Sequence, residues 1–282
     1  MSRLITTRRE ILRTVGMTAI ATAAAGLTRG ARAATLDEIK QRGYMIVATE
    51  DDFRPFEFVK DGVPTGFDTE LLKLLRKTVP FEIRQEIIPW TGLLQGVDTG
   101  KYDVAITAAL ITKERQQFLD YCSPISDATI YYVKRANDKS ITGIKDLSGK
   151  TVGVQAGSAM LAALPQLEAM LAPTGGKLGK VTQYVSYPEA YQDLAIGRTD
   201  FVTNTVINLN LLIKEKPGVF ELGQPVAAKT YIAWPVKKGN TSVLALLNGF
   251  LAAERKNGEM YKLQKEWFGQ SFEDMPESFT AT

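Results

Sequence analysis

The segment from Phe67 to Arg115 constrains the fold most, because short β-rich runs alternate in it with amphipathic helices. Leu71, Leu72 and Leu75 recur at helical spacing and make one apolar face, and Asp68 is a suitable N-cap for that helix. The expected elements are helix, strand, helix and strand, at Glu70–Val79, Phe81–Ile88, Leu93–Thr99 and Tyr102–Ala108. Such alternation is typical of an α/β protein.

A second series of the same kind begins at Lys150. Its expected strands and helices are Thr151–Gln155, Ala159–Leu171 (interrupted at Pro165), Val181–Val185, Glu189–Ile196, Phe201–Thr203 and Val206–Glu215. The connections between the series, Asp127–Lys134 and Ala227–Pro235, are rich in β-favouring residues and unlike a flexible Gly/Ser linker. We therefore expect two α/β units joined by a hinge of two strands. The periodicity of the last helical stretch, Val243–Phe268, does not assign it to either unit.

The first 33 residues are predicted to be an export signal. Arg8-Arg9 precede a weakly apolar run from Val15 to Leu27, and Ala31-Arg32-Ala33 ends the segment. A charged start, an apolar middle and an A-x-A end are typical of a secretory signal, and the paired arginines indicate the twin-arginine route. The alternative is an amphipathic first helix. The apolar run has 13 residues, against roughly 20 for a membrane span, so we expect cleavage near Ala33/Ala34 and a periplasmic protein.

The rest of the chain is nearly neutral. Residues 1–33 hold six Arg and one Glu, so the remaining 249 residues carry 28 basic and 30 acidic side chains, a formal net charge of −2. This balance gives no basis for a nucleic-acid or anionic-membrane partner.

Several kinds of catalytic site are excluded by composition. The chain has no His, which excludes Ser-His-Asp triads and His-based acid–base catalysis. Its single Cys, Cys122, excludes an intrachain disulfide and favours a structural thiol over a reactive one. With one Cys and no His, a zinc or copper site is not expected, and we expect no cofactor.

A set of short motifs in fixed order resembles one protein family. The motifs are Val47-Ala48-Thr49, Pro55-Phe56-Glu57-Phe58, Gly66-Phe67-Asp68, Gly100-Lys101-Tyr102-Asp103, Thr112-Lys113-Glu114-Arg115, Asp146-Leu147-Ser148-Gly149-Lys150, Gly197-Arg198-Thr199-Asp200 and Trp267-Phe268-Gly269. Through them, residues 36–269 resemble the periplasmic binding proteins for polar amino acids (bacterial extracellular solute-binding proteins, family 3), which include glutamine- and histidine-binding members.

The resemblance implies a two-lobed periplasmic binding protein fold of type II with ligand held between the lobes. It places residues 34–130 and 230–282 in lobe 1 and residues 131–229 in lobe 2. Hinge closure around a ligand is a known mode of such proteins. It implies that the protein is the substrate-binding component of an ABC importer, acting as a monomer that delivers a small amino-acid-like carboxylate to a permease in the inner membrane.

The resemblance also implies the contacts of the ligand carboxylate. Arg115 is expected to open a helix after Thr112, and a planar guanidinium can grip a carboxylate through two parallel hydrogen bonds; a solvated Arg is the alternative. From the second lobe, Ser158 and the Ala159 N–H are implied to cap the same carboxylate, since a helix start attracts anions. An ordinary helix N-cap accounts for Ser158 equally well.

Other positions are implied to surround the rest of the ligand. Phe53 and Trp90 match two aromatics that sandwich it, while Glu50 and Gln155 can reach its side chain. Two positions depart from the family: Thr205 stands where an acid usually holds the ligand ammonium, and Leu110 replaces a Ser or Thr hydroxyl. The candidate binding residues are Glu50, Phe53, Trp90, Ala108, Leu110, Arg115, Gln155, Ser158, Ala159, Asn204 and Thr205.

These departures favour a carboxylate whose nitrogen is absent, acylated or alkylated, unless Glu50 alone pairs an ammonium. The alternative function is an exported dehydratase of the cyclohexadienyl or arogenate type on the same frame, with Glu50 as general acid. A sensor module of a receptor would require a membrane-spanning or kinase segment, which we do not find in this sequence.

The export hypothesis makes a direct prediction. Mass spectrometry of the periplasmic protein should find a new N-terminus near Ala34. Replacing Arg8 and Arg9 together by Lys should stop export, because the twin-arginine route requires the pair. Export that survives this double replacement would contradict the assignment of the route.

Overall fold

The computed structural model describes residues 33–281. The predicted signal peptide lies outside these residues, apart from Ala33. Within the described part of the chain, no helix is both long enough and apolar enough to cross a membrane.

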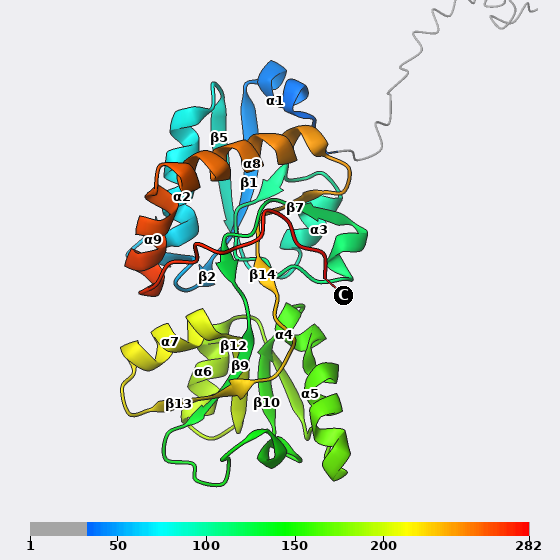
Figure 1. Ribbon diagram of the computed structural model, residues 1–282, viewed down its shortest axis with the longest axis vertical. Helices are drawn as coiled ribbons and strands as arrows, with labels where there is room; N and C mark the ends of the chain where they lie inside the picture. Colours follow the sequence, from blue (N-terminus) through cyan, green and yellow to red (C-terminus); the bar gives the residue numbers. More distant parts are fainter. Residues whose placement is uncertain (1–32, 282) are drawn as a thin grey trace, which may run out of the picture. The chain divides into compact units, whose positions relative to one another are not determined.

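A five-stranded sheet forms the centre of the first lobe (Figure 1). Its strand order is β5 (Glu82–Ile88), β1 (Tyr44–Glu50), β6 (Val104–Ala105), β15 (Pro235–Lys237) and β7 (Leu119–Tyr121). β1 runs parallel to β5 and β6, whereas β15 runs antiparallel to β6 and β7. β1 is buried between its neighbours, as the continuous apolar run of a central parallel strand predicts.

A second five-stranded sheet forms the other lobe. Its order is β11 (Val181–Tyr184), β10 (Val152–Gln155), β12 (Phe201–Thr205), β9 (Ile130–Arg135) and β13 (Phe220–Pro225). β10 runs parallel to β11 and β12, and β9 runs antiparallel to β12 and β13. Each lobe therefore has parallel strands that end at a common edge.

The helices cover the two sheets (Figure 1). Those of the first lobe are α1 (Leu36–Arg42), α2 (Phe67–Thr78), α3 (Leu93–Asp98), α8 (Thr241–Lys256) and α9 (Glu259–Phe268). Those of the second are α4 (Ala159–Ala162), α5 (Leu164–Leu171), α6 (Tyr187–Ala195) and α7 (Val206–Glu215). Short 3₁₀ turns occur at Arg115–Gln117, Ile144–Leu147 and Ala172–Thr174, and a small sheet consists of β2 (Asp52–Phe53), β3 (Glu57–Lys60) and β4 (Val63–Thr65).

Two extended strands connect the lobes, as predicted. β8 (Ser126–Asp127) pairs antiparallel with β14 (Tyr231–Ile232), and β9 follows β8 directly into the second sheet. Extended chains with paired backbones cross between lobes with little slack, unlike a Gly/Ser linker.

The last helices belong to the first lobe, an assignment that periodicity alone left open and that the family resemblance implied. The ring of Phe268 in α9 lies 4.6 Å from that of Phe67 in α2 and 4.8 Å from that of Phe56, between centroids. The helical stretch is broken between Lys256 and Glu259, at Asn257-Gly258.

Asp68 is not an N-cap, contrary to the prediction. α2 begins at Phe67, three residues before the predicted start, and its N-cap is Gly66, whose φ of 121° favours glycine. Asp68 is buried and accepts a hydrogen bond from Trp234 Nε1 at 2.8 Å. Burial raises the pKa of Asp68 to about 7, and burial together with the charges of Asp68 and Glu50 raises the pKa of Glu57. The carboxyl groups of Asp68 and Glu57 are therefore part of the core of the first lobe.

Two other expected elements are shorter than predicted. The strand expected over Tyr102–Ala108 is reduced to β6, and Arg115 begins only a three-residue 3₁₀ turn rather than a helix. Cys122 is buried, as a structural thiol should be, and burial raises its pKa to about 12.

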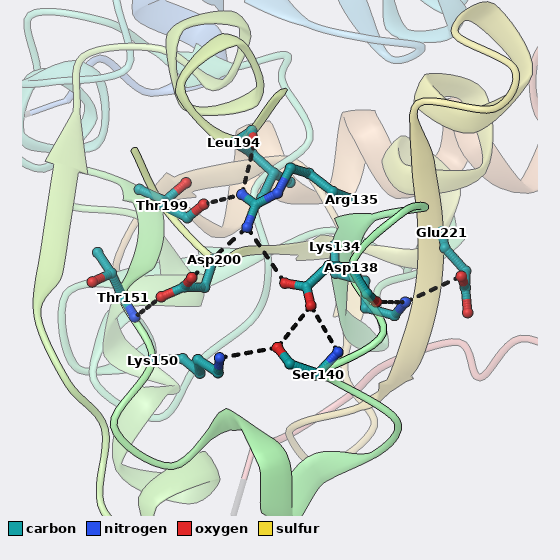
Figure 2. Close-up of polar contacts among 10 residues, drawn as sticks. All are labelled: Lys134, Arg135, Asp138, Ser140, Lys150, Thr151, Leu194, Thr199, Asp200 and Glu221. Carbon is teal, nitrogen blue, oxygen red and sulfur yellow. Dashed lines mark hydrogen bonds and ion pairs between the residues drawn. The ribbon is translucent and has the colours of Figure 1, made fainter. Parts of the chain in front are cut away.

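Arg135 holds the end of the second lobe together (Figure 2). Its Nη1 donates to the carbonyl oxygens of Leu194, at 3.0 Å, and of Thr199. Its Nη2 lies 3.4 Å from Asp138 Oδ2 and 3.8 Å from Asp200 Oδ1. One guanidinium thus satisfies one carbonyl in the last turn of α6 and one after the helix, and it fixes the turn before β12.

Arg135→Ala should lower the free energy of unfolding by about 2–4 kcal/mol, because it leaves buried carbonyls and two acids without their donor. Urea denaturation measures this loss. Lys262→Ala, which removes an exposed ion pair with Glu259 in α9, is the control and should change the free energy by less than about 0.5 kcal/mol. Equal effects of the two variants would contradict this role for Arg135.

Candidate ligand-binding site

Three polar candidates lie where strands of the two sheets end. Glu50 is the last residue of β1, Gln155 the last of β10 and Thr205 the last of β12. Ligands of α/β proteins usually bind beyond the carboxyl ends of such strands. Gln155 Nε2 donates a hydrogen bond of 2.6 Å to Glu50 Oε1, so the edges of the two lobes meet here.

Arg115 is a buried cation without an acidic partner. Its Nη1 donates to Leu110 O at 2.9 Å, and its Nη2 donates to Gly157 O, beyond the end of β10, at 3.3 Å. It forms no ion pair with any of residues 33–281, and the Tyr121 hydroxyl lies next to it. Burial lowers the pKa of Arg115, and a buried charge that lacks a counterion is costly. The site is therefore suited to an anion.

Trp90 and Arg115 meet at one backbone oxygen. Trp90 Nε1 donates to Gly157 O at 3.1 Å, and the guanidinium carbon of Arg115 lies 5.0 Å from the centroid of the Trp90 ring. The indole thus packs against the cation while its N–H reaches the second lobe. The structure brings together Glu50, Trp90, Arg115 and Gln155 from the candidate set.

Glu50 is a protonated carboxyl at neutral pH. Burial raises its pKa to about 8; the charges of Asp51 and Asp52 add to the increase, whereas the hydrogen bond from Gln155 and the charge of Arg115 oppose it. With Glu50 neutral, the positive charge of Arg115 dominates this part of the site.

Tyr187 is a buried residue of the site that the sequence analysis missed. Its ring centroid lies 5.7 Å from that of Phe53, across the lobes. Its hydroxyl lies close to Ser158 and the Gln155 backbone, yet makes no well-formed hydrogen bond within residues 33–281. A buried hydroxyl without a well-formed hydrogen bond can take one from a ligand. Its place at the start of α6, beyond β11, is the one signal that could have identified it.

Ser158 is an ordinary N-cap in the structure. Its hydroxyl accepts from Leu161 N at 3.1 Å, and Ala159, which is buried, begins α4. Because α4 has only four residues before α5 begins around Pro165, its dipole is small. The anion preference of the site therefore depends mainly on Arg115.

Asn204 and Thr205 form hydrogen bonds with each other and with residues of α6 and α7. Asn204 Nδ2 donates to Tyr191 Oη at 2.7 Å, and Thr205 N donates to Asn204 Oδ1 at 2.7 Å. The Thr205 hydroxyl donates to Asn208 Oδ1, and Asn208 Nδ2 donates to Arg54 O at 2.6 Å in the first lobe. The expected position of an ammonium-binding acid thus holds a neutral network that links the lobes.

The backbone of residues 107–110 positions Arg115. Glu57 Oε1 accepts hydrogen bonds from the Thr107 hydroxyl and, at 3.1 Å, from Ala108 N, and the Leu110 carbonyl accepts from Arg115. Ala108 and Leu110 are buried. The Leu110 side chain has no donor, so its position serves through its backbone.

A cavity of about 890 Å³ adjoins the candidate residues. Phe53, Tyr187 and Asn204 form the part of its wall next to the site, and α6 and α7 provide most of the remaining lining. It therefore lies beside the residues that surround Arg115.

The whole domain is similar to known binding proteins. The family described as bacterial extracellular solute-binding proteins, family 3, matches residues 45–270. The L-cystine-binding protein TcyJ of Escherichia coli (strain K12) is 29% identical over 236 residues, which cover 83% of this chain and 86% of TcyJ.

Two solved structures have the same fold. An ancestral arginine-binding protein bound to arginine is 31% identical, with a TM-score of 0.71 over 81% of this chain and 99% of that one. The ancestral amino acid-binding protein AncCDT-1, a precursor of cyclohexadienyl dehydratase, is 27% identical, with a TM-score of 0.71 over 82% of this chain and 98% of that one. The two-lobed fold predicted from the sequence is confirmed, and the chain belongs to the bacterial extracellular solute-binding proteins, family 3.

Proposed function

We propose that this protein is the substrate-binding component of an ABC importer for amino acids and captures a small amino-acid-like carboxylate between its lobes. The observation that carries the proposal is the buried guanidinium of Arg115, which has no acidic partner among the described residues and donates to two backbone oxygens beside the Tyr121 hydroxyl. A bidentate carboxylate supplies the missing counterion and holds the lobes together through one contact.

The neighbouring groups fit a ligand that lacks the free α-ammonium group of a standard amino acid. Glu50 is protonated near neutral pH, and Thr205 and Asn204 are neutral and bonded to their neighbours. Phe53 and Trp90 supply apolar surface to an apolar or alkylated body. We infer that the ligand is an amino-acid-derived carboxylate whose nitrogen is acylated, alkylated or absent.

The wider setting follows from the same proposal. We infer that the protein is exported by the twin-arginine route, is cleaved near Ala33/Ala34 and works in the periplasm as a monomer. Its partner is an ABC permease in the inner membrane, and it requires neither nucleic acid nor a cofactor. The lobes would be residues 34–130 with 230–282, and residues 131–229.

A dehydratase is the second candidate, favoured by one observation. Glu50 is a buried carboxyl that is protonated at pH 7, as a general acid must be, and AncCDT-1 is described as a precursor of cyclohexadienyl dehydratase. Incubation of the purified protein with a prephenate-like acid separates the two functions. Turnover that is lost in Glu50→Gln would establish the enzyme, and absence of turnover leaves the binding protein.

Arg115→Ala should abolish carboxylate binding while the fold stays intact. Loss of one partner of a buried charge pair typically costs about 2–5 kcal/mol, or roughly 30-fold to several thousand-fold in affinity. Titration calorimetry measures the loss, and circular dichroism checks the fold. Lys113→Ala removes an exposed cation two residues away and should bind like wild type. Near-wild-type affinity of Arg115→Ala would mean that the ligand carboxylate lies elsewhere.

The protonation of Glu50 should report whether the ligand carries an ammonium. Because its pKa is about 8, Glu50 must lose its proton to pair with a cation. Affinity for a cationic ligand should then rise about tenfold for each pH unit between pH 6 and pH 7.5. A ligand without a charged nitrogen should keep Glu50 protonated and lose affinity only above about pH 8.

Calorimetry at pH 7 in two buffers of different ionisation enthalpy counts the protons released. We expect that the true ligand releases no proton when it binds. We also expect that Thr205→Ala weakens binding at least as much as Glu50→Gln. Release of about one proton, with Glu50→Gln far more damaging than Thr205→Ala, would contradict the inference of a substituted nitrogen and identify a free ammonium paired with Glu50.

A further inference from the structure

The cavity of about 890 Å³ is bounded by both lobes. Its sides are α6 and α7, and β13 contributes Phe220 to its lining. Asp52, Phe53 and Arg54, in and after β2, close it from the first lobe. Residues of the first lobe therefore close one side of a groove that α6 and α7 of the second lobe form.

The lining of the cavity is mostly apolar. Leu211 and Leu212 of α7, Ala195 of α6, and Ile196 and Val219 surround it, and Ile196 and Val219 are exposed at 59% and 40%. The charged groups that line it carry both signs, and Arg54 Nε lies 3.2 Å from Asp52 Oδ1. Such a space suits an apolar chain better than a second anion.

One wall is common to the cavity and the candidate binding site. Phe53 and Tyr187 form it with their rings 5.7 Å apart between centroids, and Asn204 lines the cavity beside them. The buried Tyr187 hydroxyl has no well-formed hydrogen bond within residues 33–281. A polar group of a ligand that hydrogen-bonds to this hydroxyl lies between a carboxylate bound at Arg115 and the cavity.

We propose that the ligand carries an extended apolar substituent that leaves the carboxylate site past Phe53 and Tyr187 and occupies the space between α6 and α7. This inference rests on the proposed binding function and specifies its substrate class: a small amino-acid-derived carboxylate with an apolar chain, attached either through an acylated nitrogen or as a long side chain. The amide oxygen or the nitrogen of such a ligand is the group that meets the Tyr187 hydroxyl.

Two ligand series test the proposal with the purified protein. N-acetyl-, N-butanoyl-, N-hexanoyl- and N-octanoylglycine extend the nitrogen substituent, whereas the N-acetyl derivatives of norvaline, norleucine and 2-aminooctanoate keep the nitrogen acylated and extend the side chain. Calorimetry should show affinity rising by up to about fourfold for each added methylene in one of the series, as burial of a methylene predicts. The series that responds identifies the point of attachment.

Two variants test where the apolar substituent of the ligand lies, and a third is their control. Ala195→Trp fills the cavity from the exposed end of α6 and should weaken the longest ligand at least tenfold while leaving the shortest unchanged. Leu211→Ala enlarges the cavity and should move the best chain length upward. Ala252→Trp places the same bulk at an exposed position on α8 and should bind every member like wild type, which controls for general effects of the added ring.

The outcomes separate this inference from the function on which it rests. Two results would overturn the proposed apolar substituent and leave the binding function standing. One is binding of short carboxylates that depends on Arg115 but not on chain length. The other is equal weakening of short and long ligands by Ala195→Trp. No binding of any member, in wild type and in Arg115→Ala alike, would overturn both.

Discussion

A single buried guanidinium is the centre of the binding site that we propose for this protein. Arg115 lies between the ends of two sheets, donates to backbone oxygens on either side and pairs with no acid of residues 33–281. The cost of burying an unpaired cation is large enough that the site favours an anion over water. The protonated state of Glu50 follows the same logic, because a buried carboxyl that does not pair closely with the cation keeps its proton.

The fold brings residues of both lobes together around Arg115. Parallel strands in each lobe bring Glu50, Gln155 and Thr205 to facing edges, and only paired extended segments join the lobes at β8 and β14. Contacts such as Glu50–Gln155 and Asn208–Arg54 join the lobes directly. A ligand that contacts both lobes can therefore stabilise the closed arrangement by its affinity for it.

The sequence predicted the architecture well because hydrophobic periodicity and ordered motifs are local properties. The predictions failed for features that depend on contacts between residues far apart in the sequence. Asp68 was predicted to cap a helix, yet Trp234, far away in sequence, draws it into the core. Tyr187 carried no motif, and its role depends on the approach of Phe53 from the other lobe. The cavity beside the site could not be predicted, since it arises from the spacing of α6 and α7 against β2.

The central claim is that Arg115 selects a carboxylate, and matched pairs of ligands test it most directly. Thermal unfolding of the purified protein should be compared for a bound acid and its carboxamide, such as N-hexanoylglycine and N-hexanoylglycinamide, because a ligand of the native state raises apparent stability by mass action. The account predicts a rise in Tm with the acid and no rise with the amide. An equal rise with both would show that the buried guanidinium does not choose the ligand.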